Sequence, residues 1–117
     1  MRIPSGDPPR KIVVKDIVEG KGPAAKPGDT LTVQYVGKSF STGQEFDASW
    51  DRGQPFTFQL GSGMVIPGWD DGLEGMKAGG RRELVIPPDL GYGSQGSPPA
   101  IAPDETLVFV IDLVKIG

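Results

Sequence analysis

The chain has 117 residues and a net charge of −3, from 12 basic and 15 acidic side chains. This length fits a single domain, and the nearly balanced charge argues against nucleic acid, which needs a clustered positive surface. The sequence contains neither cysteine nor histidine. Catalysis by thiolate or histidine and metal sites built on these residues are therefore excluded, and we expect no metal and no cofactor.

The N-terminal ten residues contain three prolines and no apolar periodicity. They predict a flexible leader at residues 1–10, followed by one domain at residues 11–117. No apolar run approaches the roughly 20 residues of a membrane span, and the N-terminus lacks the apolar stretch of a signal peptide. We therefore expect no membrane partner and a cytoplasmic protein. The alternative is a secreted or anchored protein whose leader has been removed.

Extended segments are predicted where β-branched and aromatic residues cluster, with the 18 glycines and 12 prolines falling largely between them. These strands cover residues 11–18, 30–36, 45–49, 55–60, 81–86 and 105–116. In the second of them Leu31, Val33 and Tyr35 share one face, as in a half-buried antiparallel strand. Residues 87–103 form a long loop rich in glycine and proline.

One segment changes to helical periodicity. Trp69, Leu73 and Met76 are spaced i, i+4 and i+7, which predicts a helix over residues 67–76. Gly72 and Gly75 each cost about 1 kcal/mol of helix stability relative to alanine, so packing of the Trp69 face must stabilise this segment. The predicted fold class is α+β, with an antiparallel β-sheet of five to six strands half-wrapped around one short α-helix.

Two local patterns favour other functions only weakly. The segment Gly91-Tyr-Gly-Ser-Gln-Gly96 matches a dinucleotide-binding pattern, but prolines follow where a helix should begin. Asp70, Asp71 and Glu74 suggest an acid pair, yet on a short helix they are more simply its solvated face.

Aromatic side chains are concentrated near the turns. They are Tyr35, Phe46, Trp50, Phe56, Phe58, Trp69, Tyr92 and Phe109. Each one taken singly is explained by the core. Trp69 at the helix start, Tyr92 in a glycine-rich loop and Phe46-Asp47 at a strand end also suit a partly open apolar cavity.

The strongest signal is a set of short motifs in a fixed order. These are Tyr35-Val-Gly37, Gly43-Gln-Glu-Phe-Asp47, Pro55-Phe-Thr-Phe-Gln-Leu-Gly61, Val65-Ile-Pro-Gly-Trp69, Gly72-Leu-Glu-Gly-Met76, Pro88-Asp-Leu-Gly-Tyr-Gly93 and Thr106-Leu-Val-Phe109. From about residue 12 to the end, the chain resembles the FKBP-type peptidyl-prolyl cis-trans isomerases. The resemblance implies an enzyme that accelerates rotation about X-Pro bonds and assists protein folding.

The resemblance also implies a site. Its catalytic residues would be Tyr35, Phe46, Asp47, Ile66, Trp69, Tyr92 and Phe109, and its ligand-binding residues Phe56, Met64, Val65 and Ile101. Trp69 would form the floor, and the Ile66 backbone N–H and the Tyr92 hydroxyl would bond to ligand carbonyls. Asp47 would supply a buried acceptor.

The partners implied are proline-containing polypeptides and macrolides such as rapamycin or tacrolimus, bound by a monomer. Ser97, Ala100 and Ala102 depart from the family pattern in the loop and bear on ligand affinity, and no chaperone domain is inserted after Tyr92. Two alternatives remain at this point: a module that binds proline-containing segments without turnover, and a structural β-domain whose aromatic residues are only core.

Overall fold

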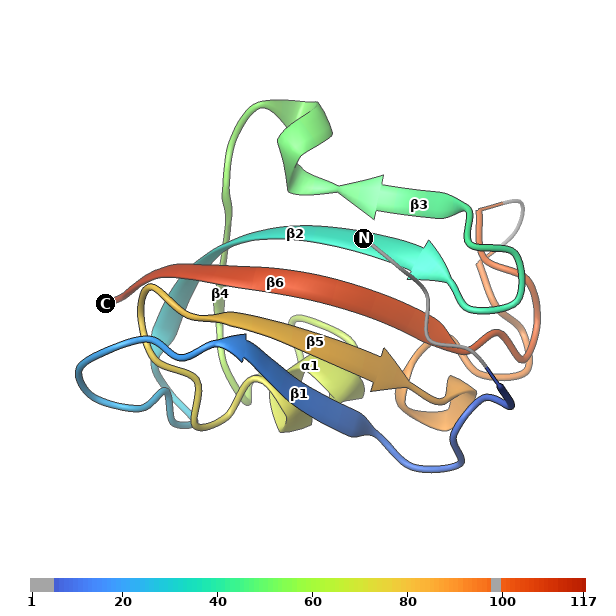
Figure 1. Cartoon of the computed structure of the whole chain (residues 1–117), viewed down its shortest axis with the longest axis horizontal. Helices are drawn as coiled ribbons and strands as arrows, with labels where there is room; N and C mark the ends of the chain where they lie inside the picture. Colours follow the sequence, from blue (N-terminus) through green and yellow to red (C-terminus); the bar gives the residue numbers. More distant parts are fainter. Residues whose placement is uncertain (1–5, 98–99) are drawn as a thin grey trace.

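The computed structural model describes residues 6–97 and 100–117. In these residues six strands form one antiparallel sheet, with a short α-helix against one face (Figure 1). The strands are β1 (Val13–Val18), β2 (Thr30–Ser39), β3 (Glu45–Ala48), β4 (Phe56–Gln59), β5 (Arg81–Ile86) and β6 (Leu107–Ile116). The helix is α1 (Pro67–Gly72), and two 3-10 turns are η1 (Ser49–Arg52) and η2 (Pro88–Leu90). The predicted fold class is confirmed.

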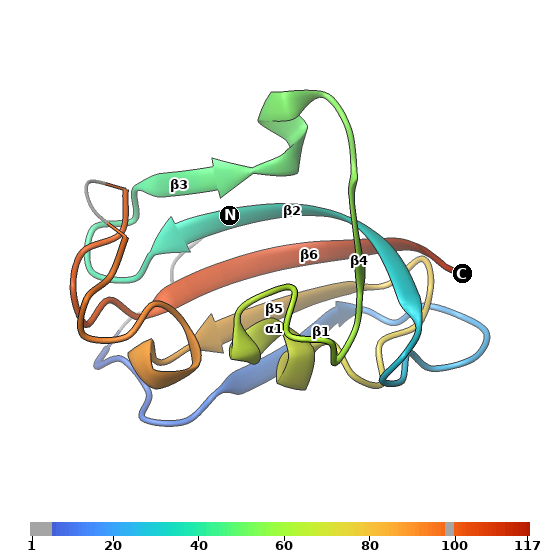
Figure 2. The same ribbon diagram turned by 180° about the vertical axis from the view of Figure 1, so that it is seen from behind.

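The strand order is β1-β5-β6-β2-β3, and β4 also pairs with β2. The long strand β2 therefore serves two neighbours on one edge: its first residues pair with β4 and its last residues with β3. On its other edge it runs beside β6 for nearly its whole length, with a register shift between Thr32 and Val33 (Figure 1). Such a shift increases the local twist of a strand. The curved sheet leaves one concave face, and α1 lies against it (Figure 2).

The core lies between this concave face and α1. Alternate residues of β6 point into it, and they are buried: Leu107, Phe109, Ile111 and Leu113. The helix approaches the sheet closely because two of its residues have no side chain. A Cβ at Gly68 would lie 2.6 Å from Ile86, and one at Gly72 would lie 2.8 Å from Leu84. Glycine in this helix thus exchanges helix propensity for close packing.

The helix ends earlier than its apolar spacing predicts, at Gly72 and not at residue 76. Gly75 has a left-handed φ of 87°, which turns the chain. Its N–H donates to the carbonyl of Ala25 at 2.8 Å, and the Ala25 N–H donates to the Met76 carbonyl at 2.7 Å. Leu73 and Met76 are nevertheless buried. The spacing therefore predicted the burial correctly and the helix length wrongly, because a distant loop binds the last turn.

The opposite, outer face of the sheet carries a separate groove of about 750 Å³. Because side chains alternate along β2, Gln34 and Val36 line this groove while Tyr35 points to the inner face. Trp50, with 56% of its surface exposed, also lines the outer groove.

Pro9 lines the outer groove as well, so part of the segment before β1 lies along the sheet. The division into a leader and a domain stays a prediction, and residues 1–5 of that leader lie outside the described residues. Within the described part of the chain, no helix has the length and apolar character needed to cross a membrane.

Candidate functional site

One cavity of about 640 Å³ opens on the inner side of the sheet. It is lined by all eleven residues selected from the sequence: Tyr35, Phe46, Asp47, Phe56, Met64, Val65, Ile66, Trp69, Tyr92, Ile101 and Phe109. Ser97 and Ala100 complete the lining. These side chains come from four strands, the start of α1 and two loops, so only the folded chain brings them together.

Trp69 lies at the centre of the aromatic lining and is 4% exposed. Its ring meets those of Tyr35 and Phe109 edge to face, with centroids 4.9 Å and 5.3 Å apart. Such perpendicular contacts suit the charge distribution of aromatic rings. Its position is fixed by the helix start, where the Trp69 N–H donates to the carbonyl of Ile66 at 2.9 Å.

The part of the cavity wall formed by Phe46 and Phe109 depends on a glycine in β2. The rings of Phe46 and Phe109 meet edge to face with centroids 5.5 Å apart, and both lie over Gly37. A Cβ at Gly37 would lie 2.7 Å from Phe109 and 2.8 Å from Phe46. Any side chain at this position would therefore displace both rings.

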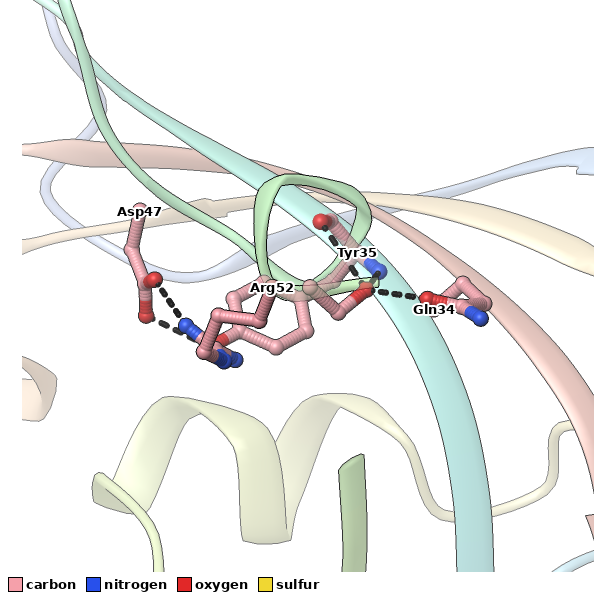
Figure 3. Close-up of polar contacts among 5 residues, drawn as sticks. Gln34, Tyr35, Asp47 and Arg52 are labelled. Carbon is pink, nitrogen blue, oxygen red and sulfur yellow. Dashed lines mark hydrogen bonds and ion pairs between the residues drawn. The ribbon is translucent and has the colours of Figure 1, made fainter. Parts of the chain in front are cut away.

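A polar network joins two lining residues, Tyr35 and Asp47, to Arg52 of η1 (Figure 3). The hydroxyl of Tyr35 donates to the Asp47 carboxylate at 2.5 Å. Arg52 donates to the other oxygen of Asp47 at 2.5 Å and to the Tyr35 hydroxyl at 2.8 Å. The side chain of Asp47 is 41% exposed, which differs from the buried acceptor expected from the sequence.

Ser49 attaches η1 to β2 and so positions this network. Its side chain is fully buried; its hydroxyl accepts the Tyr35 N–H at 2.8 Å and donates to the Gln34 side-chain carbonyl at 2.5 Å. A buried hydroxyl with both capacities used holds the turn in one place.

The mouth of the cavity is formed by two loops. Tyr92, 42% exposed, lies in the loop after η2, and its hydroxyl has no hydrogen bond within the described residues. In the same loop Ser97 and Ile101 form an antiparallel bridge, with two backbone hydrogen bonds of 2.8 Å and 2.9 Å. The backbone N–H of Ile66, on the facing loop, likewise has no partner in the described part of the chain. A hydroxyl and an N–H are thus available as donors.

Comparison with known proteins identifies the family. The family model for FKBP-type peptidyl-prolyl cis-trans isomerases matches residues 22–114. The chain belongs to this family. It is therefore an enzyme of the peptidyl-prolyl cis-trans isomerase class, as the resemblance of its motifs predicts.

Curated relatives and solved structures agree with this assignment. An FK506-binding protein of Streptomyces anulatus is 60% identical over 114 residues, covering 97% of this chain and 92% of the relative. A probable FK506-binding protein of Corynebacterium glutamicum is 48% identical, covering 98% and 95%. The crystal structure of AtFKBP13 superposes with a TM-score of 0.84 at 38% identity, covering 91% of this chain and 93% of that one.

Two tyrosines of this cavity have raised pKa values. Burial is the main cause that raises the pKa of Tyr35; its hydrogen bond to Asp47 adds to the rise, and Arg52 opposes it. Burial also raises the pKa of Tyr92, with a smaller contribution from the charge of Asp47. Both hydroxyls therefore stay protonated, and able to donate, at neutral pH.

Neither Arg52 nor Ser49 was predicted from the sequence. Ser49 ends the strand predicted at residues 45–49 and Arg52 follows that strand, and nothing in their spacing indicates that η1 folds back onto β2. The two weaker sequence patterns gain no support from the structure. Gly91 to Gly96 form turns and begin no helix, and Asp70, Asp71 and Glu74 are absent from the lining.

Proposed function

We propose that the aromatic cavity is the site at which this isomerase binds an X-Pro bond and favours its twisted form. The observation that supports this most is the convergence of eleven residues from separate motifs on one apolar hollow. The outer groove is larger but shares none of these residues.

The chemistry needs no bond to be broken. Rotation about the amide faces a barrier of about 18–20 kcal/mol because resonance gives the C–N bond partial double-bond character. In the twisted transition state this resonance is lost, and the carbonyl becomes less polar. A dry, apolar cavity that fits the twisted amide better than the planar one therefore lowers the barrier. This mechanism suits a chain without histidine or cysteine.

Each part of the cavity has a role in this proposal. The proline ring packs on Trp69, between the rings of Tyr35 and Phe109. The N–H of Ile66 and the hydroxyl of Tyr92 hold the carbonyls on either side. Asp47, paired with Arg52, holds the Tyr35 phenol in place. A millionfold acceleration corresponds to about 8 kcal/mol, which apolar burial and two oriented hydrogen bonds can supply together.

We propose that the partners of this protein bind in the same cavity. Proline-containing polypeptides are the substrates, and assistance to protein folding follows from the slow exchange of X-Pro bonds, which takes tens to hundreds of seconds uncatalysed. The names of the relatives from Streptomyces anulatus and Corynebacterium glutamicum refer to FK506, which supports macrolide binding here. We propose that the chain acts as a monomer in the cytoplasm.

An isomerase assay on a short X-Pro peptide tests the site. We expect Trp69→Leu to lower kcat/KM at least tenfold, and Trp50→Leu, on the outer face, to leave it unchanged. Circular dichroism checks that both variants fold. Equal activity in the folded Trp69→Leu variant would show that the cavity is not the site. Binding of the peptide without acceleration by the parent protein would favour a binding module.

A further inference from the structure

The loop at residues 61–66 forms part of the cavity wall, but few hydrogen bonds hold it in place. It connects β4 to α1 and brings Met64, Val65 and Ile66 to the cavity. Within the described residues, the backbone N–H groups from residue 64 to residue 66 make no hydrogen bond. At its end the Ile66 carbonyl accepts the N–H groups of Trp69 and Asp70, at 2.9 Å and 3.4 Å. At its start the Ser62 hydroxyl donates to the Gln59 carbonyl at 2.8 Å, and one side chain of α1 supplies the other hydrogen bonds.

That side chain is Asp70. Its two carboxylate oxygens accept one hydrogen bond each, from the Gly61 N–H at 2.8 Å and from the Gly63 N–H at 3.2 Å. Gly61 and Gly63 have left-handed φ angles of 79° and 78°, a conformation that residues with side chains rarely adopt. Hydrogen bonds from N–H groups to an ionised carboxylate are stronger than those to a neutral acceptor.

We propose that Asp70 is a positioning residue for the isomerase reaction. It touches neither the cavity nor the proposed substrate, and it acts by holding the 61–66 loop so that the Ile66 N–H and the Val65 side chain are in place before substrate binds. Without Asp70, the substrate must order this loop as it binds. Such an ordering cost weakens binding, because preorganised sites avoid it.

The neighbouring Asp71 provides a matched control. It carries the same charge in the same helix, one residue further on, and it is exposed. In the described part of the chain it makes no hydrogen bond or ion pair. A general effect of negative charge near the helix start would therefore follow both residues, whereas positioning of the loop follows Asp70 alone.

The test compares Asp70→Ala, Asp70→Asn and Asp71→Ala in the full chain, with isomerase kinetics and amide hydrogen exchange of Gly61 and Gly63. We expect Asp70→Ala to raise KM about three- to tenfold with kcat within twofold of the parent, and to speed exchange of both amides. Asp70→Asn keeps only one acceptor oxygen, so its KM and its amide exchange rates should lie between those of the parent and of Asp70→Ala. Asp71→Ala should match the parent in both measurements.

Equal KM in the parent and in Asp70→Ala would overturn the inference, as would an equal rise in Asp70→Ala and Asp71→Ala. If Asp70→Ala does not fold, the folded Asp70→Asn variant decides by the same two measurements. The inference rests on the proposed site, and Trp69→Leu separates the two. Unchanged activity in Trp69→Leu overturns the site, whereas a loss there beside a normal Asp70→Ala overturns only the role of Asp70.

Discussion

Tyr35 on β2 and Asp47 on β3 share a hydrogen bond of 2.5 Å, with the phenol as donor and the carboxylate as acceptor. The bond joins two strands that pair directly. Gly37, two residues after Tyr35 in β2, lies opposite Asp47 in β3. Arg52 holds both partners from η1. The phenol is thus placed between an anion that opposes its ionisation and a cation that favours it, which makes its titration sensitive to either partner.

The pKa of Tyr35 should respond in opposite directions to loss of these partners. The chain has two tyrosines, so Tyr35 is the only tyrosine in a Tyr92→Phe background. There, Arg52→Met should raise its pKa further, because a cation that lowers it is lost, and Asp47→Asn should lower it. Ultraviolet absorbance of the phenolate follows the titration, with Arg81→Met as the control for a lost surface arginine. Equal pKa values in all four proteins would contradict the network.

The same pKa makes stability depend on alkaline pH. The folded-state pKa of Tyr35 lies above the value near 10 of an unfolded tyrosine. The proton is therefore bound more tightly in the folded state, and its contribution to stability is complete below about pH 10. It is lost as the pH rises through the folded-state pKa. Denaturant unfolding at increasing pH should show this loss in the parent and a smaller one in Tyr35→Phe.

The isomerase rate should be independent of pH between about 6 and 9. Free carboxylates titrate near 4 and tyrosines near 10, and the pKa of both tyrosines is raised here. The measurement is kcat/KM for an X-Pro peptide, corrected for the uncatalysed rate and for folding. A midpoint near neutrality that moves in Asp47→Asn would instead indicate proton transfer by a general acid or base.

Phe109→Ala and Tyr92→Phe should separate shape from hydrogen bonding. Phe109 is buried in the core and in the cavity wall, so its truncation should cost about 3–5 kcal/mol of unfolding free energy. Tyr92→Phe removes one half-exposed hydroxyl and should leave stability nearly unchanged while weakening macrolide binding. Thermal unfolding and ligand titration measure the two effects. An equal fall in melting temperature in both variants would contradict the assignment.

Trp69 should report macrolide binding through its fluorescence. Its ring lines the cavity, whereas Trp50 lines the outer groove and contributes an exposed background. Replacing Trp50 with phenylalanine removes this background without touching the cavity. The emission of the Trp50→Phe protein should then change on titration with rapamycin and level off at saturation. A constant signal at saturation demonstrated by calorimetry would show that the ligand binds elsewhere.

Sequence patterns predicted the strands well because their causes are local. Alternation of Leu31, Val33 and Tyr35 depends on neighbouring residues, and the strand found there begins as predicted and extends to Ser39. The helix end was wrong because it is decided by a hydrogen-bond exchange with Ala25, some fifty residues away in the chain.

In the site, too, features with local causes were predictable and features decided by distant residues were not. Its aromatic lining was predictable from the motifs, since six of the seven motifs contain an aromatic residue. Arg52 and Asp70 were not. Asp70 resembles an ordinary solvated residue of a helix, and only the path of the loop at residues 61–66 makes its carboxylate an acceptor for two N–H groups.

The position of β6 in the sheet has a consequence for synthesis of the protein. The last strand in the sequence lies in the middle of the sheet, between β5 and β2. The pair β1-β5 and the group of β2, β3 and β4 are therefore joined in one sheet only after residues 107–116 have left the ribosome. Until then the edges of β2 and β5 that pair with β6 stay without their partner. Pairings between distant segments also fold slowly. A chain stopped before β6 would accordingly lose the whole fold and not one strand of it.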